Sequence, residues 1–346
     1  IRDSYSNEAF AWVSEAKFLS LLPSYSEEPI ILDKAVVDLD EDGIDEWFIP
    51  MPSGYVIRHA DDEVARVPCD VVSAMYGGRS VSVHYRLPVC HTFEVQGEAH
   101  KCLAFLTERY ADFAHGPGWT KHTRFKIPVN VEEKWEAGAQ MDDIDGDGLP
   151  DLVVAQTKGT TKLEVLTQVY FATGPFRYST EPSVTFTTHG AITSPDLLDV
   201  DGDGHKDLVL VRIPFGVTQF VNYFVRGKVS IRIDAHLFDN GTFPEKPTFV
   251  HKMTLGAPEG REQVSAESGD YNGDGLRDLA IALASDQLGI LIGEKGAFLS
   301  RKPWVTVDLP AFGVARKCDL DGNERDDIVL FHPAGALSKR IDIIQF

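Results

Sequence analysis

Short apolar runs alternate with polar turns along most of the chain. The five clearest runs cover residues 47–49, 152–154, 208–210, 279–281 and 328–330. Runs this short, bounded by Gly, Asp and Asn, are typical of buried β-strands. No apolar run approaches the roughly 20 residues of a membrane helix, so we expect no membrane insertion. The pattern therefore predicts an all-β protein.

Each of these runs directly follows an acidic segment of nine residues. The shared pattern is Asp-x-Asp/Asn-x-Asp/Asn-Gly-x-x-Asp, and the five copies begin at Asp38, Asp143, Asp199, Asp270 and Asp319. Short apolar segments also precede the loops, such as residues 35–37 and 197–198. We therefore expect each copy to form the tip of a β-hairpin.

The chemistry of one copy suits a hard cation. Alternate spacing points positions one, three and five inward, and glycine at position six permits the sharp turn that returns position nine. The carbonyl of position seven can complete the shell. Calcium accepts six to eight oxygen ligands, whereas magnesium prefers a small octahedral shell and zinc prefers His or Cys. The sequence therefore predicts calcium at these tips.

The predicted calcium ligands follow positions one, three, five, seven and nine of each copy. They are Asp38, Asp40, Asp42, Ile44 and Glu46; Asp143, Asp145, Asp147, Leu149 and Asp151; Asp199, Asp201, Asp203, His205 and Asp207; Asp270, Asn272, Asp274, Leu276 and Asp278; and Asp319, Asp321, Asn323, Arg325 and Asp327. We expect the first four copies to bind calcium. The fifth should be weak or empty, because Glu324 stands at its glycine position.

The spacing of the copies indicates a repeat protein. Their first residues lie 105, 56, 71 and 49 residues apart, so residues 70–138 should contain one unit without an acidic loop. Gly-x-Phe turns at 174–176, 241–243 and 296–298 separate two further strand-like runs after three of the copies. Each unit thus reads as four antiparallel strands. Units of this size predict a β-propeller of six blades, or seven if the N-terminus adds one.

We expect residues 31–346 to form one propeller domain, with 70–138 as its atypical blade. Residues 1–30 should close the ring, because the last unit lacks an outer strand and 9–22 are apolar enough to supply it.

The acidic loops resemble the calcium-binding repeats of FG-GAP/VCBS propellers, the family that includes the integrin α-subunit head. Residues 238–243 also resemble the hairpin signature of VCBS repeats. The resemblance covers about 38–346, apart from 70–138. It implies a propeller, bound calcium and an extracellular, cell-surface or periplasmic location. It implies no single activity, because members include adhesion receptors, lectin-like modules and polysaccharide-cleaving enzymes.

The net charge of the chain limits which classes of partner we expect it to bind. The chain has 33 basic and 53 acidic residues, a net charge of -20, which argues against nucleic acid or an anionic membrane. No nucleophile-elbow, P-loop or dinucleotide motif occurs. We therefore expect a non-enzymatic module that binds a protein or a glycan. The alternatives are a structural subunit of a larger surface assembly, and a polysaccharide lyase or hydrolase that uses several of His84, His91, His100, His115 and His122.

Four cysteines bear on the compartment, namely Cys69, Cys90, Cys102 and Cys318. An oxidising compartment would favour a disulfide in the unit that lacks a calcium loop, and we expect Cys90–Cys102. The alternative is a zinc site formed by Cys90, His91, His100 and Cys102, although this spacing matches no common zinc module.

Overall fold

The computed structural model describes residues 36–346 with gaps at 52, 61, 71, 77–81, 87, 96, 108, 129–135, 160–162, 190, 193–194, 215–221, 224, 258–264 and 333–334. The chain divides into two compact units. The first holds the described residues up to Met141 with Gly148–Val154 and Tyr170–Pro182, and the second holds Asp142–Asp147, Ala155–Val169 and Ser183–Phe346. The predicted ring-closing segment, residues 1–30, lies outside the described residues.

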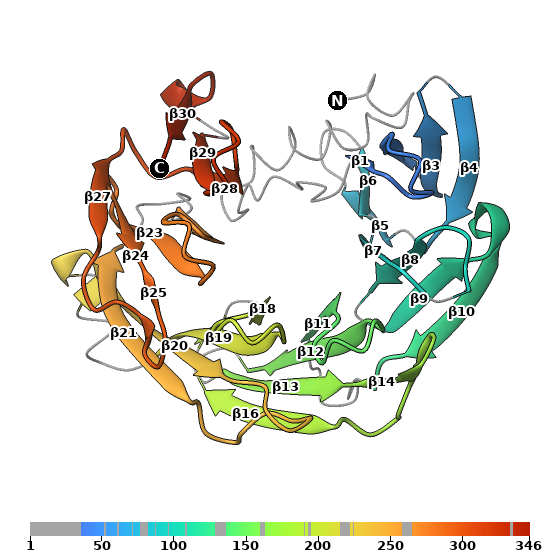
Figure 1. Cartoon of the computed structure of the whole chain (residues 1–346), viewed down its shortest axis with the longest axis horizontal. Helices are drawn as coiled ribbons and strands as arrows, with labels where there is room; N and C mark the ends of the chain where they lie inside the picture. The colour runs from blue at the N-terminus through green and yellow to red at the C-terminus, as the bar shows by residue number, and fades with distance from the viewer. Residues whose placement is uncertain are drawn as a thin grey trace. The chain divides into compact units, whose positions relative to one another are not determined.

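The first unit contains two antiparallel four-stranded sheets (Figure 1). One has the order β1-β2-β3-β4, with β1 Val36–Val37, β2 Glu46–Met51, β3 Gly54–His59 and β4 Asp62–Pro68. The other has the order β10-β9-β8-β7, with β7 Val89–Phe93, β8 Cys102–Leu106, β9 Tyr110–His115 and β10 Lys121–Lys126. A 3-10 turn, η2 (Pro117–Trp119), joins β9 to β10.

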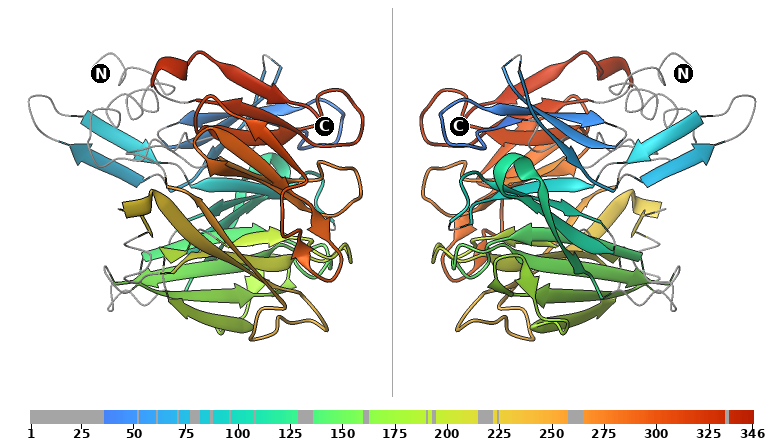
Figure 2. Two further views of the ribbon diagram at one scale, coloured as in Figure 1. Left: turned by 90° about the vertical axis from the view of Figure 1, so that its left-hand side faces the viewer. Right: turned by 90° about the vertical axis from the view of Figure 1, so that its right-hand side faces the viewer.

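Smaller strand pairs complete this unit. β5 (Val72–Tyr76) and β6 (Ser82–Arg86) pair only with each other, and Figure 2 draws them in light blue as a separate hairpin. β14 (Ala172–Gly174) pairs with β15 (Arg177–Tyr178). Three strands cross the division between the units, namely β11 Glu136–Asp142, β12 Asp151–Lys158 and β13 Glu164–Tyr170.

The second unit continues with the same kind of sheet. β13 pairs with β16 (Val184–His189). The next sheet contains β17 Ala191–Ile192, β18 Asp196–Leu198, β19 Asp207–Ile213, β20 Lys228–His236 and β21 Phe249–Gly256. It is followed by β22 Ala266–Gly269, β23 Asp278–Ala284, β24 Gln287–Leu291 and β27 Val305–Asp308. The last sheet has three strands, β28 Val314–Cys318, β29 Asp327–Phe331 and β30 Ile341–Ile344, with η3 (Gly335–Leu337) before β30.

The predicted Gly-x-Phe turns are confirmed as small hairpins between third and fourth strands. β25 (Gly293–Glu294) and β26 (Phe298–Leu299) flank Gly296, between β24 and β27. Between β20 and β21, Asp239 and Thr242 form a bridge. The two residues inside that bridge, Asn240 and Gly241, have φ of 52° and 78°, the left-handed pair of a tight hairpin turn.

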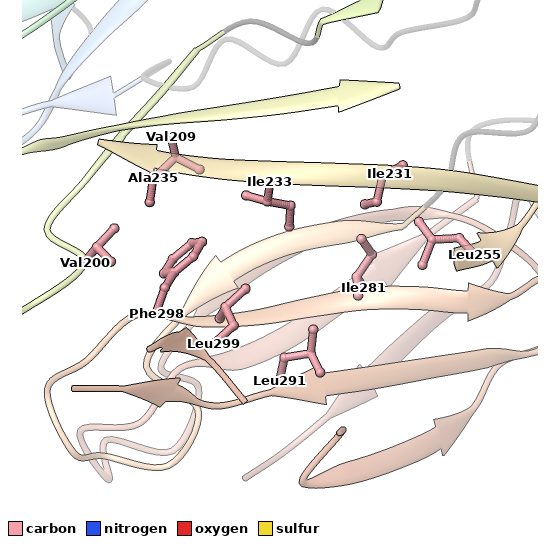
Figure 3. Close-up of a cluster of buried hydrophobic side chains, with 10 residues drawn as sticks. All are labelled: Val200, Val209, Ile231, Ile233, Ala235, Leu255, Ile281, Leu291, Phe298 and Leu299. Carbon is pink, nitrogen blue, oxygen red and sulfur yellow. The ribbon is translucent and has the colours of Figure 1, made fainter. Parts of the chain in front are cut away.

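Neighbouring sheets bury their faces against each other. Figure 3 shows Ile231 and Ile233 of β20 facing Ile281 of β23 and Leu291 of β24 within one buried cluster. In the first unit, Tyr55 of β3 stacks on Phe105 of β8 with ring centroids 5.7 Å apart. A single four-stranded sheet cannot cover both of its faces, so each sheet of the repeat depends on the neighbouring sheets.

Candidate cation-binding loops

Four of the predicted acidic segments form hairpin tips with one shared frame. In each, the residue before position one pairs with position nine: Val37 with Glu46, Leu198 with Asp207, Gly269 with Asp278 and Cys318 with Asp327. Position nine is also the first residue of the following strand. The prediction of hairpin tips before buried strands is therefore confirmed for these copies.

A sixth segment, in the unit that we expected to lack an acidic loop, has the same strand register as these copies. Phe93 pairs with Cys102, the first residue of β8, so residues 94–101 connect two strands over the same length as the acidic copies. Glu94 and Glu98 occupy positions one and five, and Cys102 replaces the acid at position nine. The signal in the sequence was the pair of Glu94 and Glu98 ahead of the apolar run 103–106.

The loop backbone needs a left-handed residue at two positions, four and six. In the third copy these are Gly202 (φ 80°) and Gly204 (φ 92°). Glu41 at position four and Glu324 at position six adopt the same conformation with φ of 63° and 66°. Because side chains disfavour this region, both glutamates strain their loops. The fifth copy thus keeps the shared turn despite lacking the expected glycine.

Hydrogen bonds inside each loop turn the carboxylates inward. In the third copy, the N–H groups of Gly202 and Gly204 donate to Oδ1 and Oδ2 of Asp199 over 2.7 and 3.1 Å. The N–H of His205 donates to Oδ1 of Asp203 over 2.8 Å. The fourth copy repeats these bonds at Asp270 and Asp274. The fifth repeats them at Asp319 and Asn323.

Carboxylate oxygens therefore gather in the loops. Oxygens from three acids lie within 4.8 Å of one another in the first copy (Asp38, Asp40, Asp42), the third (Asp199, Asp201, Asp203) and the fifth (Asp319, Asp321, Asp327). Each oxygen that accepts one N–H keeps a second lone pair for an ion. An all-oxygen donor set fits calcium, with Asp270, Asn272 and Asp274 as its counterpart in the fourth copy.

The carboxylate at position nine is buried and joins the loop to the segment that follows the third strand of the sheet. Asp207 is fully buried and accepts N–H bonds from Val200 and Phe238, both at 2.8 Å. Asp278 accepts N–H bonds from Tyr271 (2.9 Å) and Gly293 (2.7 Å). Burial raises the pKa of both carboxyls to about 6, although these donors oppose the shift. A divalent ion beside them would favour the charged form.

The second copy lies where the two units divide, so its parts belong to different units. In the second unit, the N–H of Gly146 donates to Oδ1 of Asp143 over 2.9 Å, and the N–H of Asp147 donates to Oδ1 of Asp145 over 3.2 Å. In the first unit, Asp151 is buried and accepts the N–H of Ala172 over 2.8 Å. Each part matches its counterpart in the third copy.

Loops of neighbouring sheets are hydrogen-bonded to each other. In the second unit, the N–H of Lys206 donates to the carbonyl of Ile144 over 2.9 Å, and the N–H of Asp326 donates to that of Asp270 over 2.8 Å. In the first unit, the N–H of Lys101 donates to the carbonyl of Leu39 over 2.8 Å. Position eight of one loop thus contacts position one or two of the preceding loop.

The expected Cys90–Cys102 disulfide is wrong for this structure, in which all four cysteines are free. Cys90 pairs with Phe105 and Cys102 pairs with Phe93, so the two cysteines lie three residues apart along the sheet and on opposite faces. In the alternative zinc site, Cys90 lies on the face opposite to His91 and Cys102, so these three ligands do not share one face. His100 instead lies beside Trp119, with ring centroids 5.7 Å apart.

The histidines named for an enzymatic alternative do not converge. His115 pairs with Lys121 and His122 with Ala114, so the two side chains lie on opposite faces of the sheet. His115 contacts Glu98, whereas His122 joins Asp112 and Arg124. Trp119 and Tyr170 are buried in the core, so neither ring offers a face on which a sugar could stack. The side chain of His84 lies outside the described residues.

Comparison with known proteins identifies one repeat. Residues 143–210 match the FG-GAP-like repeat family, so the predicted resemblance is confirmed over the second and third copies. No curated protein matches the chain. None of the helical segments in the described part of the chain has the length and apolarity needed to span a bilayer.

Several solved structures are similar at low identity. BBS1N from its complex with ARL6DN is 13% identical, with 90% of each chain covered and a TM-score of 0.39. Rhamnogalacturonan lyase YesW is 12% identical, covering 83% of this chain and 58% of the lyase, with a TM-score of 0.39. The Vibrio cholerae biofilm matrix protein Bap1 is 10% identical, covering 86% and 73%, with a TM-score of 0.36.

Proposed function

We propose that this protein is a calcium-stabilised β-propeller that acts as a non-enzymatic interaction module. The observation that supports this most is the shared loop frame, which gathers carboxylate oxygens within 4.8 Å in three copies. Four acids brought together without an ion would repel one another beside a buried strand. Calcium would remove that repulsion and fix the hairpin tips.

The repeat supports six blades in one domain. Loops in the shared sequence frame precede β2, β8, β12, β19, β23 and β29, one for each sheet of the repeat. The sheet of β28, β29 and β30 has one strand fewer than the sheet of β22, β23, β24 and β27. We propose that residues 1–30 supply this missing strand.

We propose that the loops at one end of the blades bind a protein or a glycan, and that calcium acts on the loops rather than contacting the partner. The protein would work outside the cell, on its surface or in the periplasm. The argument for this location is the millimolar calcium found there, which suits sites of modest affinity. The cysteines do not contribute to this argument, because all four are free.

Removal of calcium tests the stabilising role. EGTA should lower the melting temperature by several degrees, and added calcium should restore it, because an ion that binds only the folded state stabilises it by mass action. Differential scanning fluorimetry measures this. Asp203→Ala should reduce the calcium-induced rise more than Asp321→Ala, because the third copy keeps glycine at both left-handed positions. A melting temperature that is unchanged by EGTA and calcium would refute the proposal.

The partner can be sought with a glycan array and a pull-down from extracellular or periplasmic extract, both with calcium present. Capture that calcium promotes and EGTA abolishes is the expected result. Equal binding with calcium and with EGTA would show that the calcium-ordered loops do not recognise the partner.

A further inference from the structure

The first loop differs from the others in how its position-nine acid is held. In the four other copies, Oδ1 of the aspartate at position nine accepts a backbone N–H. The donors are Ala172, Phe238, Gly293 and Phe346. In the first loop, Glu46 Oε1 instead contacts the imidazole Nδ1 of His59 at 2.8 Å. Glu46 Oε2 keeps the usual bond, from the N–H of Leu39 at 2.7 Å.

The short turn after β3 explains why an imidazole takes the place of the backbone donor. β3 ends at His59 and β4 begins at Asp62, so a tight turn follows directly and Ala60 adopts a φ of 51°. The longer segment that supplies a backbone donor after β20 and β24 is therefore absent here. Glutamate, one methylene longer than aspartate, reaches the imidazole instead.

His59 brings a nitrogen into a site otherwise made of oxygen. Ligand atoms of Asp42, Glu46 and His59 lie within 4.8 Å of one another, and this is the only such group with a histidine in the part of the chain that the structure describes. Nδ1 of His59 lies 3.9 Å from Oδ2 of Asp42. The side chain of Glu46 is 3% exposed, whereas those of His59 and Asp42 are 32% and 42% exposed. An ion can thus enter from solvent onto a buried carboxylate.

We infer that the first loop binds a transition-metal ion of the zinc type through His59, Glu46 and Asp42. The inference rests on the proposed role of the loops as cation sites, and it assigns one loop a different class of ion. One imidazole and two carboxylates are ligands that zinc accepts, whereas calcium takes oxygen.

The distances suit this ion with little movement. Zinc with ligands near 2.0–2.2 Å in a tetrahedron needs them about 3.4 Å apart. The two distances from His59 Nδ1, 2.8 Å to Glu46 and 3.9 Å to Asp42, lie on either side of that value. The ion would replace the proton that Nδ1 shares with Glu46. At the other position-nine acids the donor is a backbone N–H, which cannot be replaced in this way.

The competing explanation is that His59 only replaces the missing backbone donor. His59→Gln separates the two, because the amide N–H of glutamine can still donate to Glu46 but the side chain is a poor zinc ligand. His205→Gln is the matched control, since Nδ1 of His205 lies 3.3 Å from Asp203 in the third loop and 42% of that side chain is exposed.

Isothermal titration with zinc, on untagged full-length protein in millimolar calcium, tests the inference. Wild type and His205→Gln should bind one zinc ion that calcium does not displace, and His59→Gln should bind it at least tenfold more weakly. Cobalt should give a visible absorption band in wild type that His59→Gln loses. Equal zinc affinity in wild type and His59→Gln, or no zinc binding in wild type, would overturn the inference.

The same variant keeps the two proposals apart. The calcium-induced rise in melting temperature should be the same in His59→Gln as in wild type, because the other loops are unchanged. If calcium stabilises neither protein while His59-dependent zinc binding persists, the calcium proposal fails and this inference stands. If calcium stabilises both proteins and zinc binds equally well to both, the calcium proposal stands and this inference fails.

Discussion

The loops before β8 and β19 have the same length and strand register but are held in different ways. Before β19, Asp207 accepts the N–H of Phe238. Before β8, Cys102 cannot do so, and Glu98 at position five accepts the corresponding N–H, that of Gly116, over 3.0 Å. Trp119 adds a bond from its Nε1 to the carbonyl of Lys101 over 2.8 Å. The turn can therefore be held by the acid at position nine, or by hydrogen bonds to Glu98 and from Trp119.

The two loops share one strand register although only one of them has an acid at position nine. One buried backbone N–H after the third strand needs an acceptor in both loops, because an unsatisfied buried donor is costly. The identity of the acceptor can change, and so can the charge of the loop. The turn is therefore defined by the sheet, and the proposed ion binding would be an addition to it.

The largest effect should come from Asp207→Ala. It leaves the N–H groups of Val200 and Phe238 buried without an acceptor, and we expect a loss of about 2–4 kcal/mol in the free energy of unfolding. Urea denaturation in EGTA measures this without any contribution from an ion. Asp207→Asn, which keeps one oxygen, should lose less. A loss under 1 kcal/mol for the alanine variant would show that these bonds do not hold the loop.

Glu98→Ala should cost about 1–2 kcal/mol, because it removes one acceptor from a partly exposed position. This loss should be equal with calcium and with EGTA, because Cys102 replaces the acid at position nine and we expect no ion in this loop. Urea titrations in both buffers compare the two values. A loss that appears only with calcium would place an ion in this loop.

Glu324→Gly should stabilise the protein by about 1 kcal/mol, because glycine adopts the left-handed conformation of position six without strain. Gly204→Ala at the same position of the third loop should destabilise by a similar amount. No atom lies within 4 Å of a Cβ built there, so the cost is conformational and not steric. Thermal melts of both variants in EGTA give the signs. A loss of stability in Glu324→Gly, or a gain in Gly204→Ala, would show that the backbone at position six does not keep its left-handed conformation.

The smallest effect concerns pH in the sheet of β19 and β20, where His236 pairs with Leu208. Burial lowers the pKa of His236. The folded state then binds fewer protons than the unfolded state, so stability should fall as the pH drops below about 6.5. His236→Gln, which can still donate to the carbonyl of Pro244, should show a shallower loss between pH 7 and 5. Parallel slopes for the two proteins would contradict this.

The sequence predicted the strands and hairpin tips because a nine-residue motif before each apolar run is a local signal. It did not reveal the loop before β8, since the motif was defined by its carboxylates and Cys102 lacks one. Nor could it show that Asp207 bonds to Phe238, 31 residues away, because that partner depends on tertiary structure. The Cys90–Cys102 error has the same origin, since strand register decides which faces two residues share.

Hydrogen bonds join neighbouring loops, from the N–H of Lys206 to Ile144 and from that of Asp326 to Asp270, and they would link the proposed binding of one ion to the next. An ion that orders one loop also restricts the next, so the second ion costs less conformational entropy to bind. Filling along such linked loops should then be positively cooperative. The protein would respond to calcium over a narrower range of concentration than isolated loops could.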